Sequence, residues 1–359
     1  MKIPYKHLLQ NIETKPSIAE LSDKLFQLGH EHEIFEEIFD MELTPNRGDC
    51  LSLDGILREL KLFYSISNKR DIYEKDIRPF EFQFLNEAKS SCGSISFLKV
   101  EINEVPQNYK DFMEQYFSDL NIKKINFFTD ISNFLSYETG QPTHCYDSAK
   151  IKGQLSLRKL NNESKFETLL NKKIILEKGD LVFSNGNNEV INLAGVMGGK
   201  NNSCNEKTKS VIIECAHFNP ESILGRSVKY NLNSEAAHKF ERNTDRYCHN
   251  YVLRRFINVI ESHCKITNLE LFSKTYDKEV KRKVPIKISK INKILGIKID
   301  DKEYTTYLKK LGFNSHENMT EIPSYRNDIN TINDIAEEIA RAIGYDNIKS
   351  QPVDINIKN

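Results

Sequence analysis

Four segments in the middle of the chain hold residue types that could bind a ligand or take part in chemistry. Glu214 is the most informative residue, because it interrupts an apolar strand pattern where a carboxyl group costs free energy unless it is paired or awaits a ligand. His144 lies in a tight loop that could aim its ring into a cavity, and Gly198 would let the backbone approach a ligand closely. The segments are GQPTHCYD (140–147), LAGVMGG (193–199), IIECAHFNP (212–220) and LNSEAAHKFER (232–242).

Each of these residues also has a purely structural interpretation. A buried glutamate can bond to backbone groups or to an arginine, a loop histidine can be a packing or surface residue, and paired glycines can simply form a turn. Cys215 is an unsuitable catalytic partner for Glu214, because neighbouring side chains of an extended strand point to opposite faces. The residues alone leave both interpretations open.

Several other chemistries are excluded by the sequence. LAGVMGGKNN is not a phosphate-binding P-loop, because Lys200 is followed by Asn201 rather than by Ser or Thr, and neither H-E-x-x-H nor G-x-S-x-G occurs. The 7 cysteines contain no C-x-x-C pair, which argues against a disulfide framework or zinc knuckle and for a reducing compartment. No apolar run approaches the roughly 18 residues of a membrane helix, so we expect a cytoplasmic protein with no membrane contact.

The length and charge of the chain set wider bounds. With 359 residues the chain is long enough for two or three domains. Its 51 basic and 51 acidic side chains cancel, which argues weakly against a nucleic-acid partner. The charges are nevertheless uneven, with acidic residues concentrated at 31–42 and basic residues at 278–293. Such runs are ordinarily solvated surface, and a local phosphate-binding patch is the alternative.

The two ends of the chain resemble each other. SIAELSDKLFQLG near the start and DKEYTTYLKKLGF near the end both show apolar residues at helical spacing and a glycine suited to a helix C-cap. Each is followed by a second matching segment, in which Arg47 and Glu59 correspond to Arg326 and Glu338. We therefore expect two related modules around a different central domain.

The central stretch reads as mixed α/β. SISFLKVEI and SVIIECAHF predict strands, the Asn185-Gly186 dipeptide predicts a hairpin turn, and the periodicity of 245–263 predicts a long amphipathic helix. Dense charge without periodicity indicates linkers near 68–80 and 273–285. The expected domains are therefore 1–75, 80–275 and 282–352.

Seven motifs, taken in order, resemble the β subunit of bacterial phenylalanyl-tRNA synthetase. They span nearly the whole chain, and their shared order is far more specific than any single motif. The resemblance implies a mixed α/β (α+β) fold, in which two related small helix–strand modules of winged-helix or DNA-binding type flank a central tRNA-editing domain. The motifs are TPNRGDCLS, GQPTHCYD, LAGVMGG, ECAHFNPESI, HKFERNTDR, PSYRNDI and AEEIARAIGYDNI.

The resemblance implies that the central domain hydrolyses tRNA mischarged with tyrosine. Glu214 is expected to accept the tyrosine hydroxyl and His144 to orient the ester or a water, so that a positioned water and the terminal ribose suffice without a covalent nucleophile. Serine stands where threonine is common and lysine where arginine is usual. The matching positions are His144, Gly198, Glu214, Ser234 and Ala236, with Lys123 at the tRNA end.

The resemblance also implies RNA and metal contacts. Local phosphate contacts are expected at Lys123 and in the basic stretch at Lys281, Arg282 and Lys283. A Mg²⁺ site is implied by acidic residues at matching positions, because hard oxygen atoms are the ligands that Mg²⁺ takes. The alternative is an acidic first helical turn that favours the helix dipole, with Arg341 as an ion-pair partner. The acidic residues are Asp328, Asp334, Glu337 and Glu338.

The implied function is that of a phenylalanine-tRNA ligase β subunit. With an α subunit, in a heterotetramer of two α and two β chains, it would support the charging of tRNA(Phe) with phenylalanine, the ATP being used by the assembled ligase. The family's inserted OB-fold tRNA-binding domain and its C-terminal catalytic-like and anticodon-binding domains have no counterpart here. Two alternatives stay open: a free-standing Tyr-tRNA(Phe) deacylase that works without α, and a non-catalytic scaffold that binds RNA or a partner.

Overall fold

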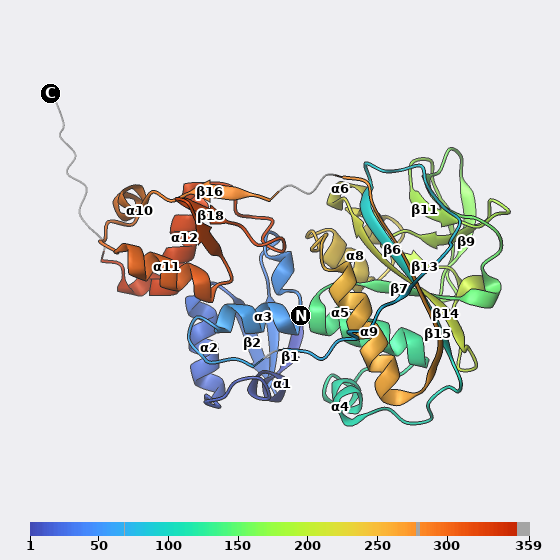
Figure 1. Cartoon of the computed structure of the whole chain (residues 1–359), viewed down its shortest axis with the longest axis horizontal. Coiled ribbons are helices and arrows are strands. Elements are labelled where there is room, and N and C mark those ends of the chain that lie inside the picture. The colour runs from blue at the N-terminus through green and yellow to red at the C-terminus, as the bar shows by residue number, and fades with distance from the viewer. Residues whose placement is uncertain (68, 278–280, 350–359) are drawn as a thin grey trace. The chain divides into compact units, whose positions relative to one another are not determined.

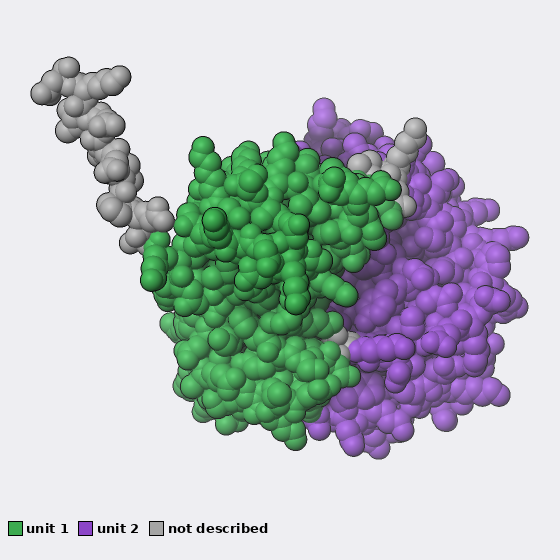
Figure 2. Space-filling model, turned by 60° about the vertical axis from the view of Figure 1, so that its left-hand side comes forward, with its two compact units in different colours: residues 1–47, 55–68, 280–359 green, residues 48–54, 69–279 purple. Residues whose placement is uncertain are grey.

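The computed structural model describes residues 1–67, 69–277 and 281–349. The chain divides into two compact units, coloured separately in Figure 2: unit 1 (1–47, 55–68 and 280–359) and unit 2 (48–54 and 69–279). Helices and several small sheets occur in both, which confirms the predicted mixed α/β class. Among the described helices, none combines the length and apolar character that crossing a membrane requires.

Unit 1 consists of two modules with the same order of elements, strand-helix-helix-strand-strand-helix (Figure 1). The sheet orders also match, β1-β3-β2 in the first module and β16-β18-β17 in the second. This confirms the internal resemblance seen in the sequence. The first module contains β1 (Lys2–Pro4), α1 (Tyr5–Leu9), α2 (Ile18–Gln27), β2 (Glu31–Phe35), β3 (Ile38–Glu42) and α3 (Leu53–Leu60), whose first two residues count with unit 2. The second contains β16 (Lys283–Pro285), α10 (Ile288–Leu295), α11 (Asp301–Lys310), β17 (Asn314–His316), β18 (Met319–Glu321) and α12 (Ile332–Ile343).

Local sequence signals begin and end the matching helices α2 and α11. Ser17 caps α2 by accepting a hydrogen bond from the Glu20 amide, and Asp300 caps α11 in a reciprocal capping box with Glu303. Gly29 and Gly312 follow the helices with φ of +76° and +88°, a conformation that side chains other than glycine rarely adopt. The predicted helices and their glycine ends are therefore confirmed.

The two modules of unit 1 share one apolar core. Leu28 and Leu62 of the first module pack into the cluster built by the second, which includes Leu308 and Ile339. Polar contacts also join the modules, since the Lys310 ammonium donates to the Leu62 carbonyl oxygen at 3.0 Å. The resemblance between the chain ends therefore reflects two copies of one module packed together.

Unit 2 is built on two five-stranded sheets in the described part of the chain, with one apolar core between them (Figure 1). The first sheet has the order β4 (Arg78–Pro79), β15 (Ile266–Thr275), β6 (Cys92–Ile102), β14 (Ser210–Phe218), β7 (Thr143–Asp147). The second has the order β13 (Met197–Gly198), β12 (Val190–Leu193), β11 (Leu181–Ser184), β8 (Leu155–Lys159), β5 (Phe84–Asn86). A separate hairpin consists of β9 (Ser164–Glu167) and β10 (Lys173–Leu176). The helices are α4 (Asp111–Asp119), α5 (Phe127–Thr139), α6 (Pro220–Ile223), α7 (Arg226–Lys229), α8 (Glu235–Phe240) and α9 (His249–His263).

The predicted strands and the hairpin at Asn185-Gly186 are confirmed by β6, β14 and the antiparallel pair β11 and β12. The predicted linker at 273–285 is partly wrong, because β15 continues to Thr275 and β16 begins at Lys283; residues 278–280 lie outside the described residues. The linker at 68–80 likewise contains β4. The long helix begins at His249 rather than at 245, because the Asp245 side chain accepts a hydrogen bond from the Tyr247 amide and forms a turn there.

Candidate active site

A small cavity in unit 2 lies where the edges of its two sheets meet under helix α8. Strands β7 and β14 of the first sheet contribute His144 and Glu214, and strands β12 and β13 of the second contribute Asn192 and Gly198. Helix α8 contributes Ala236 and Phe240. The remaining lining residues are Pro142, Thr143, Gly195, Val196 and Met197. Apart from His144 and Glu214, no residue that lines this cavity within the described chain has an ionisable side chain.

His144 and Glu214 are direct cross-strand partners. The register between β7 and β14 pairs Glu214 with His144. Directly opposed residues of an antiparallel pair put their side chains on the same face of the sheet. Two residues that are 70 positions apart in the sequence are therefore held side by side by the sheet.

The Glu214 carboxyl is buried and has one hydrogen-bond partner among the described residues. The Tyr146 hydroxyl donates a hydrogen bond of 2.6 Å to Glu214 Oε2, and Asn192 Nδ2 donates one of 2.8 Å to the same hydroxyl. Burial raises the pKa of Glu214 to about 8, although the hydrogen bond from Tyr146 acts in the opposite direction. At neutral pH the carboxyl group is therefore mostly protonated, and it acts as a polar but uncharged binding group.

His144 stands at the same cavity as a neutral imidazole. Burial lowers its pKa to about 4, so that its ring carries no charge at neutral pH. Its ring meets the Tyr146 ring edge to face, with 4.5 Å between the centroids. Within the described chain neither ring nitrogen has a hydrogen-bond partner, which leaves both for a substrate or a water.

Gly198 permits this position of the His144 ring. A Cβ atom built on Gly198 would lie 2.3 Å from His144 Cε1 and 2.8 Å from Nε2, both far inside van der Waals contact. We therefore expect Gly198→Ala to displace the imidazole by roughly 1 Å and to lower about 100-fold the hydrolysis that the sequence resemblance predicts for this site. Rates of the purified variant, with circular dichroism to confirm folding, measure the effect.

The double variant His144→Ala/Gly198→Ala provides the control for this prediction. If Gly198 acts by making room for His144, adding Gly198→Ala to a chain that already lacks the imidazole should change the rate little. Fully additive losses would show that Gly198 acts through another group, such as Leu169, whose Cδ1 lies 2.9 Å from the same built Cβ atom.

Of the other three residues predicted to take part in editing, one lines the cavity and two do not. Ala236 lines the cavity, but Ser234 does not: it caps α8 by accepting from the Ala237 amide and donates to the Val196 carbonyl oxygen at 2.6 Å. Ser234 therefore fixes the position of the helix that closes the cavity. Lys123 is exposed in the loop between α4 and α5 and is not among the lining residues.

Sequence reasoning missed Tyr146 and Asn192. Tyr146 follows His144 by two residues on β7, so strand alternation would have placed both on one face. Asn192 is a polar residue inside the apolar strand β12, which is the same signal that singled out Glu214. Neither signal says that the two side chains meet, because the contact depends on how the two sheets pack.

The cavity is small for the tyrosine side chain that the sequence resemblance predicts as its ligand. Its volume of about 60 Å³ is room for a few water molecules and less than a phenol ring occupies. Met197, a partly buried and flexible lining residue, is the side chain best able to move aside. Entry of an aromatic side chain therefore requires a local change of rotamer.

A larger hollow on the same unit has a different character. Its volume is about 810 Å³, and it is lined by lysines, glutamates and asparagines that include Lys200, paired with Glu167 at 2.9 Å. It contains no His, Cys or Asp among its described lining residues. The larger hollow therefore has mixed charges and no pair of residues like His144 and Glu214. The smaller cavity, which has that pair, is the candidate active site.

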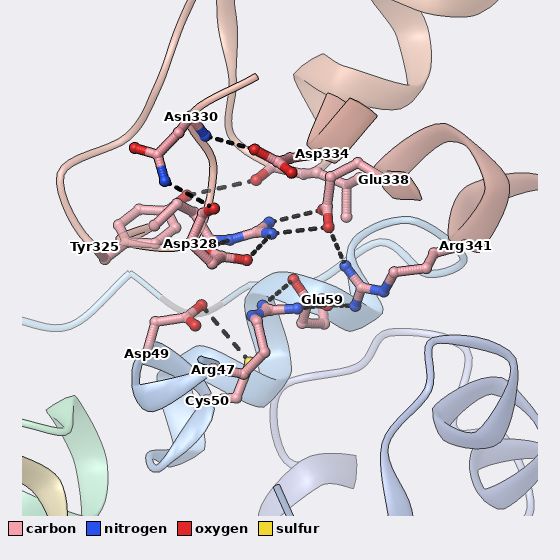
Figure 3. Close-up of polar contacts among 12 residues, drawn as sticks. Arg47, Asp49, Cys50, Glu59, Tyr325, Asp328, Asn330, Asp334, Glu338 and Arg341 are labelled. Carbon is pink, nitrogen blue, oxygen red and sulfur yellow. Dashed lines mark hydrogen bonds and ion pairs between the residues drawn. The ribbon is translucent and has the colours of Figure 1, made fainter. Parts of the chain in front are cut away.

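In unit 1, most of the acidic residues predicted to bind Mg²⁺ are hydrogen-bonded to protein groups (Figure 3). Both oxygens of Asp328 accept from the buried Arg326, at 3.0 and 2.8 Å, and Glu338 accepts from Arg326 at 2.7 and 2.8 Å. Asp334 accepts from the Thr331 amide in the capping box of α12, and Glu337 is exposed. Three of the four carboxylates are thus bound to N–H donors, which is a poor fit to a metal site.

Arg341 links this cluster to the first module. Its guanidinium donates to Glu338 Oε1 at 2.7 Å and also to Glu59, a buried carboxylate that Arg47 pairs with at 2.8 Å (Figure 3). These arginines hold the pKa values of Glu59 and Glu338 below the usual range. Arg341 is therefore an ion-pair partner of Glu338, as the alternative interpretation of these acidic residues expected. The magnesium site itself stays a prediction.

A titration with Mg²⁺ separates the two interpretations. Because Asp328 and Glu338 already have arginine partners, we expect millimolar MgCl₂ to leave the melting temperature of the chain unchanged relative to an equal ionic strength of NaCl. A rise that is specific to Mg²⁺, and that disappears in Asp328→Asn, would instead support the metal site.

The basic stretch predicted to contact tRNA begins the second module. Lys281 and Lys283 are exposed, and Lys281 lies 3.5 Å from Glu321. Arg282 is half-buried and donates to the Arg326 carbonyl oxygen. Lys281 and Lys283 are thus accessible to a phosphate, whereas Arg282 has a structural contact; the role of all three in binding RNA stays a prediction.

Comparisons with known proteins match both parts of the chain. Residues 97–265 match the model of the B3/4 domain, and residues 284–345 match that of the tRNA synthetase B5 domain. The chain is 30% identical over 370 residues to the phenylalanine–tRNA ligase β subunit of Wolbachia sp. subsp. Brugia malayi, covering 96% of this chain and 46% of the relative. It is 31% identical over 347 residues to that of Rickettsia felis, covering 88% and 42%. The chain thus spans less than half the length of these curated relatives.

A solved structure shares the fold. The crystal structure of an N-terminal fragment of the phenylalanyl-tRNA synthetase β subunit from Pyrococcus horikoshii matches with a TM-score of 0.52. The match covers 95% of this chain and 99% of the fragment at 14% sequence identity. At that identity the likeness is evidence for the fold alone.

Proposed function

Because the chain belongs to the family of phenylalanine–tRNA ligase β subunits, we propose that it acts in such a ligase and hydrolyses mischarged Tyr-tRNA(Phe) in the cavity of unit 2. The observation that carries the proposal is the pairing of His144 with Glu214 on adjacent strands at an otherwise uncharged cavity. An uncharged pocket with one buried polar acceptor and donor suits a phenol side chain, which is apolar except for its hydroxyl.

The small chemical difference between tyrosine and phenylalanine explains why a ligase needs a separate hydrolytic site. Tyrosine differs from phenylalanine by one hydroxyl, which an apolar synthetic pocket rejects imperfectly, whereas a site that hydrogen-bonds the hydroxyl discriminates by about four to five orders of magnitude. Glu214 binds this hydroxyl, and a phenylalanyl group would leave one oxygen of the buried carboxyl, Oε1, without a partner.

The hydrolysis itself needs no covalent intermediate. Water adds to the carbonyl carbon of the aminoacyl ester, the bond from that carbon to the ribose oxygen breaks, and the ribose oxygen takes a proton as tyrosine leaves. His144, neutral at pH 7, orients the water or the ester. Ser234 holds α8, so that Ala236 closes the cavity beside the substrate. Lys123 contacts the 3′ end of the tRNA.

The wider role rests on the family. As a β chain, the protein would pair with an α subunit as a heterotetramer of two α and two β chains, and the assembled enzyme would charge tRNA(Phe) with phenylalanine, using ATP and Mg²⁺. A free-standing deacylase is the second candidate, because His144 and Glu214 lie in one unit of this chain and need no residue from α. A scaffold that only binds RNA or a partner is the third.

The experiment measures Tyr-tRNA(Phe) hydrolysis by the purified chain, with and without the α subunit of the same organism. Selective turnover that requires α supports the subunit role, and equal turnover without α supports the free-standing deacylase. Absence of selective hydrolysis in both reactions would reject the editing function and leave the scaffold.

A further inference from the structure

Tyr146 contacts both of the residues to which hydrolysis is assigned, although it does not line the cavity. Its side chain is fully buried. Its hydroxyl hydrogen-bonds to Glu214 Oε2 at 2.6 Å, and its ring packs edge to face against His144 with 4.5 Å between the centroids. The same hydroxyl accepts from Asn192 Nδ2 at 2.8 Å. One buried side chain therefore joins the two strands and the second sheet at the candidate active site.

The directions of these hydrogen bonds decide how Glu214 can meet a substrate. A phenol has one proton to donate, and the Asn192 amide occupies its oxygen as a donor, so the Tyr146 proton is directed to Glu214. Oε2 of Glu214 is therefore an acceptor in both protonation states. In the neutral acid the proton must lie on Oε1, the oxygen that has no hydrogen-bond partner in the described part of the chain.

We infer that Tyr146 is a positioning residue that sets the specificity of the cavity for a phenolic side chain, by holding Oε2 of Glu214 and presenting Oε1 to the substrate hydroxyl. The inference rests on the proposed function and assigns it a further residue. A substrate phenol can accept from the neutral acid or donate to the carboxylate, so it satisfies Oε1 in either state. A phenyl ring can do neither.

The pH dependence of hydrolysis can report on the hydrogen bond between Tyr146 and Glu214. Burial raises the pKa of the nearby thiols on β6, β7 and β14 and of Tyr146 itself, and lowers that of His144, so these groups stay neutral near pH 7. On α8, burial lowers the pKa of Lys239 to about 8. The Lys239 ammonium donates its hydrogen bonds to Ser136 on α5 and not to Glu214. The hydrogen bond from Tyr146 lowers the pKa of Glu214, and its removal should raise that pKa further. The thiols are those of Cys92, Cys145 and Cys215.

Tyr146→Phe tests the inference directly, because it removes one hydroxyl and keeps the ring that packs on His144. We expect kcat/KM for Tyr-tRNA(Phe) to fall about 10-fold or more, with little change for Phe-tRNA(Phe), so that selectivity falls by the same factor. The pH at the midpoint of the kcat/KM profile for Tyr-tRNA(Phe) should rise, because the hydrogen bond that lowers the pKa of Glu214 is lost. A variant with the selectivity and pH midpoint of the parent chain would overturn the inference and leave the proposed function intact.

A matched control and a second readout keep the result interpretable. Tyr116→Phe removes the hydroxyl of another buried tyrosine of unit 2. That hydroxyl has no hydrogen-bond partner among the described residues, so its removal should change neither selectivity nor pH midpoint. The pKa of Glu214, measured by NMR in the full chain with ¹³C-labelled glutamate, should rise in Tyr146→Phe even if the parent chain shows no hydrolysis. An unchanged pKa would overturn the inference independently of the proposed function.

Asn192→Leu serves if Tyr146→Phe does not fold. Leucine keeps the approximate shape of asparagine but removes the donor, so the phenol oxygen becomes free to accept a proton from Glu214 Oε2. Oε1 then no longer carries the proton in every neutral molecule, and selectivity should fall several-fold. Parent-like selectivity in this variant would contradict the proposed direction of the hydrogen bonds.

Discussion

Glutamine in place of Glu214 should keep selective hydrolysis of Tyr-tRNA(Phe) at pH 7, whereas alanine should reduce selectivity about 100-fold or more. Burial raises the pKa of Glu214 to about 8, so the carboxyl is mostly neutral at pH 7, and glutamine is a neutral group of the same shape. Its carbonyl can accept from Tyr146 while its amide donates toward the substrate. Alanine offers neither group and leaves the Tyr146 hydroxyl without its acceptor. Single-turnover deacylation of Tyr-tRNA(Phe) and Phe-tRNA(Phe) measures the effect.

The pH dependence of stability provides the control for the Glu214 variants. Glu214 has a folded pKa above its usual 4.5, so the folded chain binds a proton that the unfolded chain releases, and stability falls as pH rises from about 4.5 to about 8. Glutamine has no such proton, and Glu214→Gln should stabilise unit 2 at pH 7 by up to about 3 kcal/mol. Urea unfolding at several pH values measures this. If glutamine instead destabilised the chain equally at all pH values, the neutral state of Glu214 would be contradicted.

Removal of Arg341 should have the largest effect on stability. Its guanidinium lies between Glu59 of the first module and Glu338 of the second, and all three side chains are buried. Arg341→Met keeps an unbranched apolar side chain but leaves two buried carboxylates with one arginine fewer. Breaking a buried ion pair in this way costs about 3 to 5 kcal/mol, so unit 1 should unfold at much lower urea concentration.

Lys310→Met is the matched control for Arg341. Lys310 also joins the two modules, but its ammonium donates to a single backbone carbonyl oxygen and has no carboxylate partner among the described residues. We expect it to cost about 1 kcal/mol or less. Equal losses in the two variants would show that any contact between the modules matters as much as the ionic cluster.

The repeated modules could be predicted from the sequence, but their shared ion pair could not. Arg47 and Arg326, with Glu59 and Glu338, match in the two ends of the chain, and in each module the arginine pairs with the glutamate. The partners are 12 residues apart, a separation that no helical or strand period brings together. Leu62 stands at the position in the first module that corresponds to Arg341, so the arginine that joins Glu59 to Glu338 has no counterpart there. Only the packing of the modules reveals it.

The candidate site shows the same limit. Glu214 could be predicted as special, because a carboxyl group inside an apolar strand is costly. Its neighbours Tyr146 and Asn192 became visible only when the register of β7 against β14 and the packing of β12 were known. The acidic residues in and before α12 show a further limit, since their types suit Mg²⁺ and the sequence does not reveal that Asp328 and Glu338 pair with Arg326.

The ratio of hydrolysis rates for Tyr-tRNA(Phe) and Phe-tRNA(Phe), measured together in one reaction with and without an α subunit, tests the central claim most directly. A cavity in which Glu214 binds the phenol hydroxyl predicts a ratio well above about 10 in favour of Tyr-tRNA(Phe), which Glu214→Ala removes. Equal rates for the two substrates, or a ratio that survives Glu214→Ala, would contradict it.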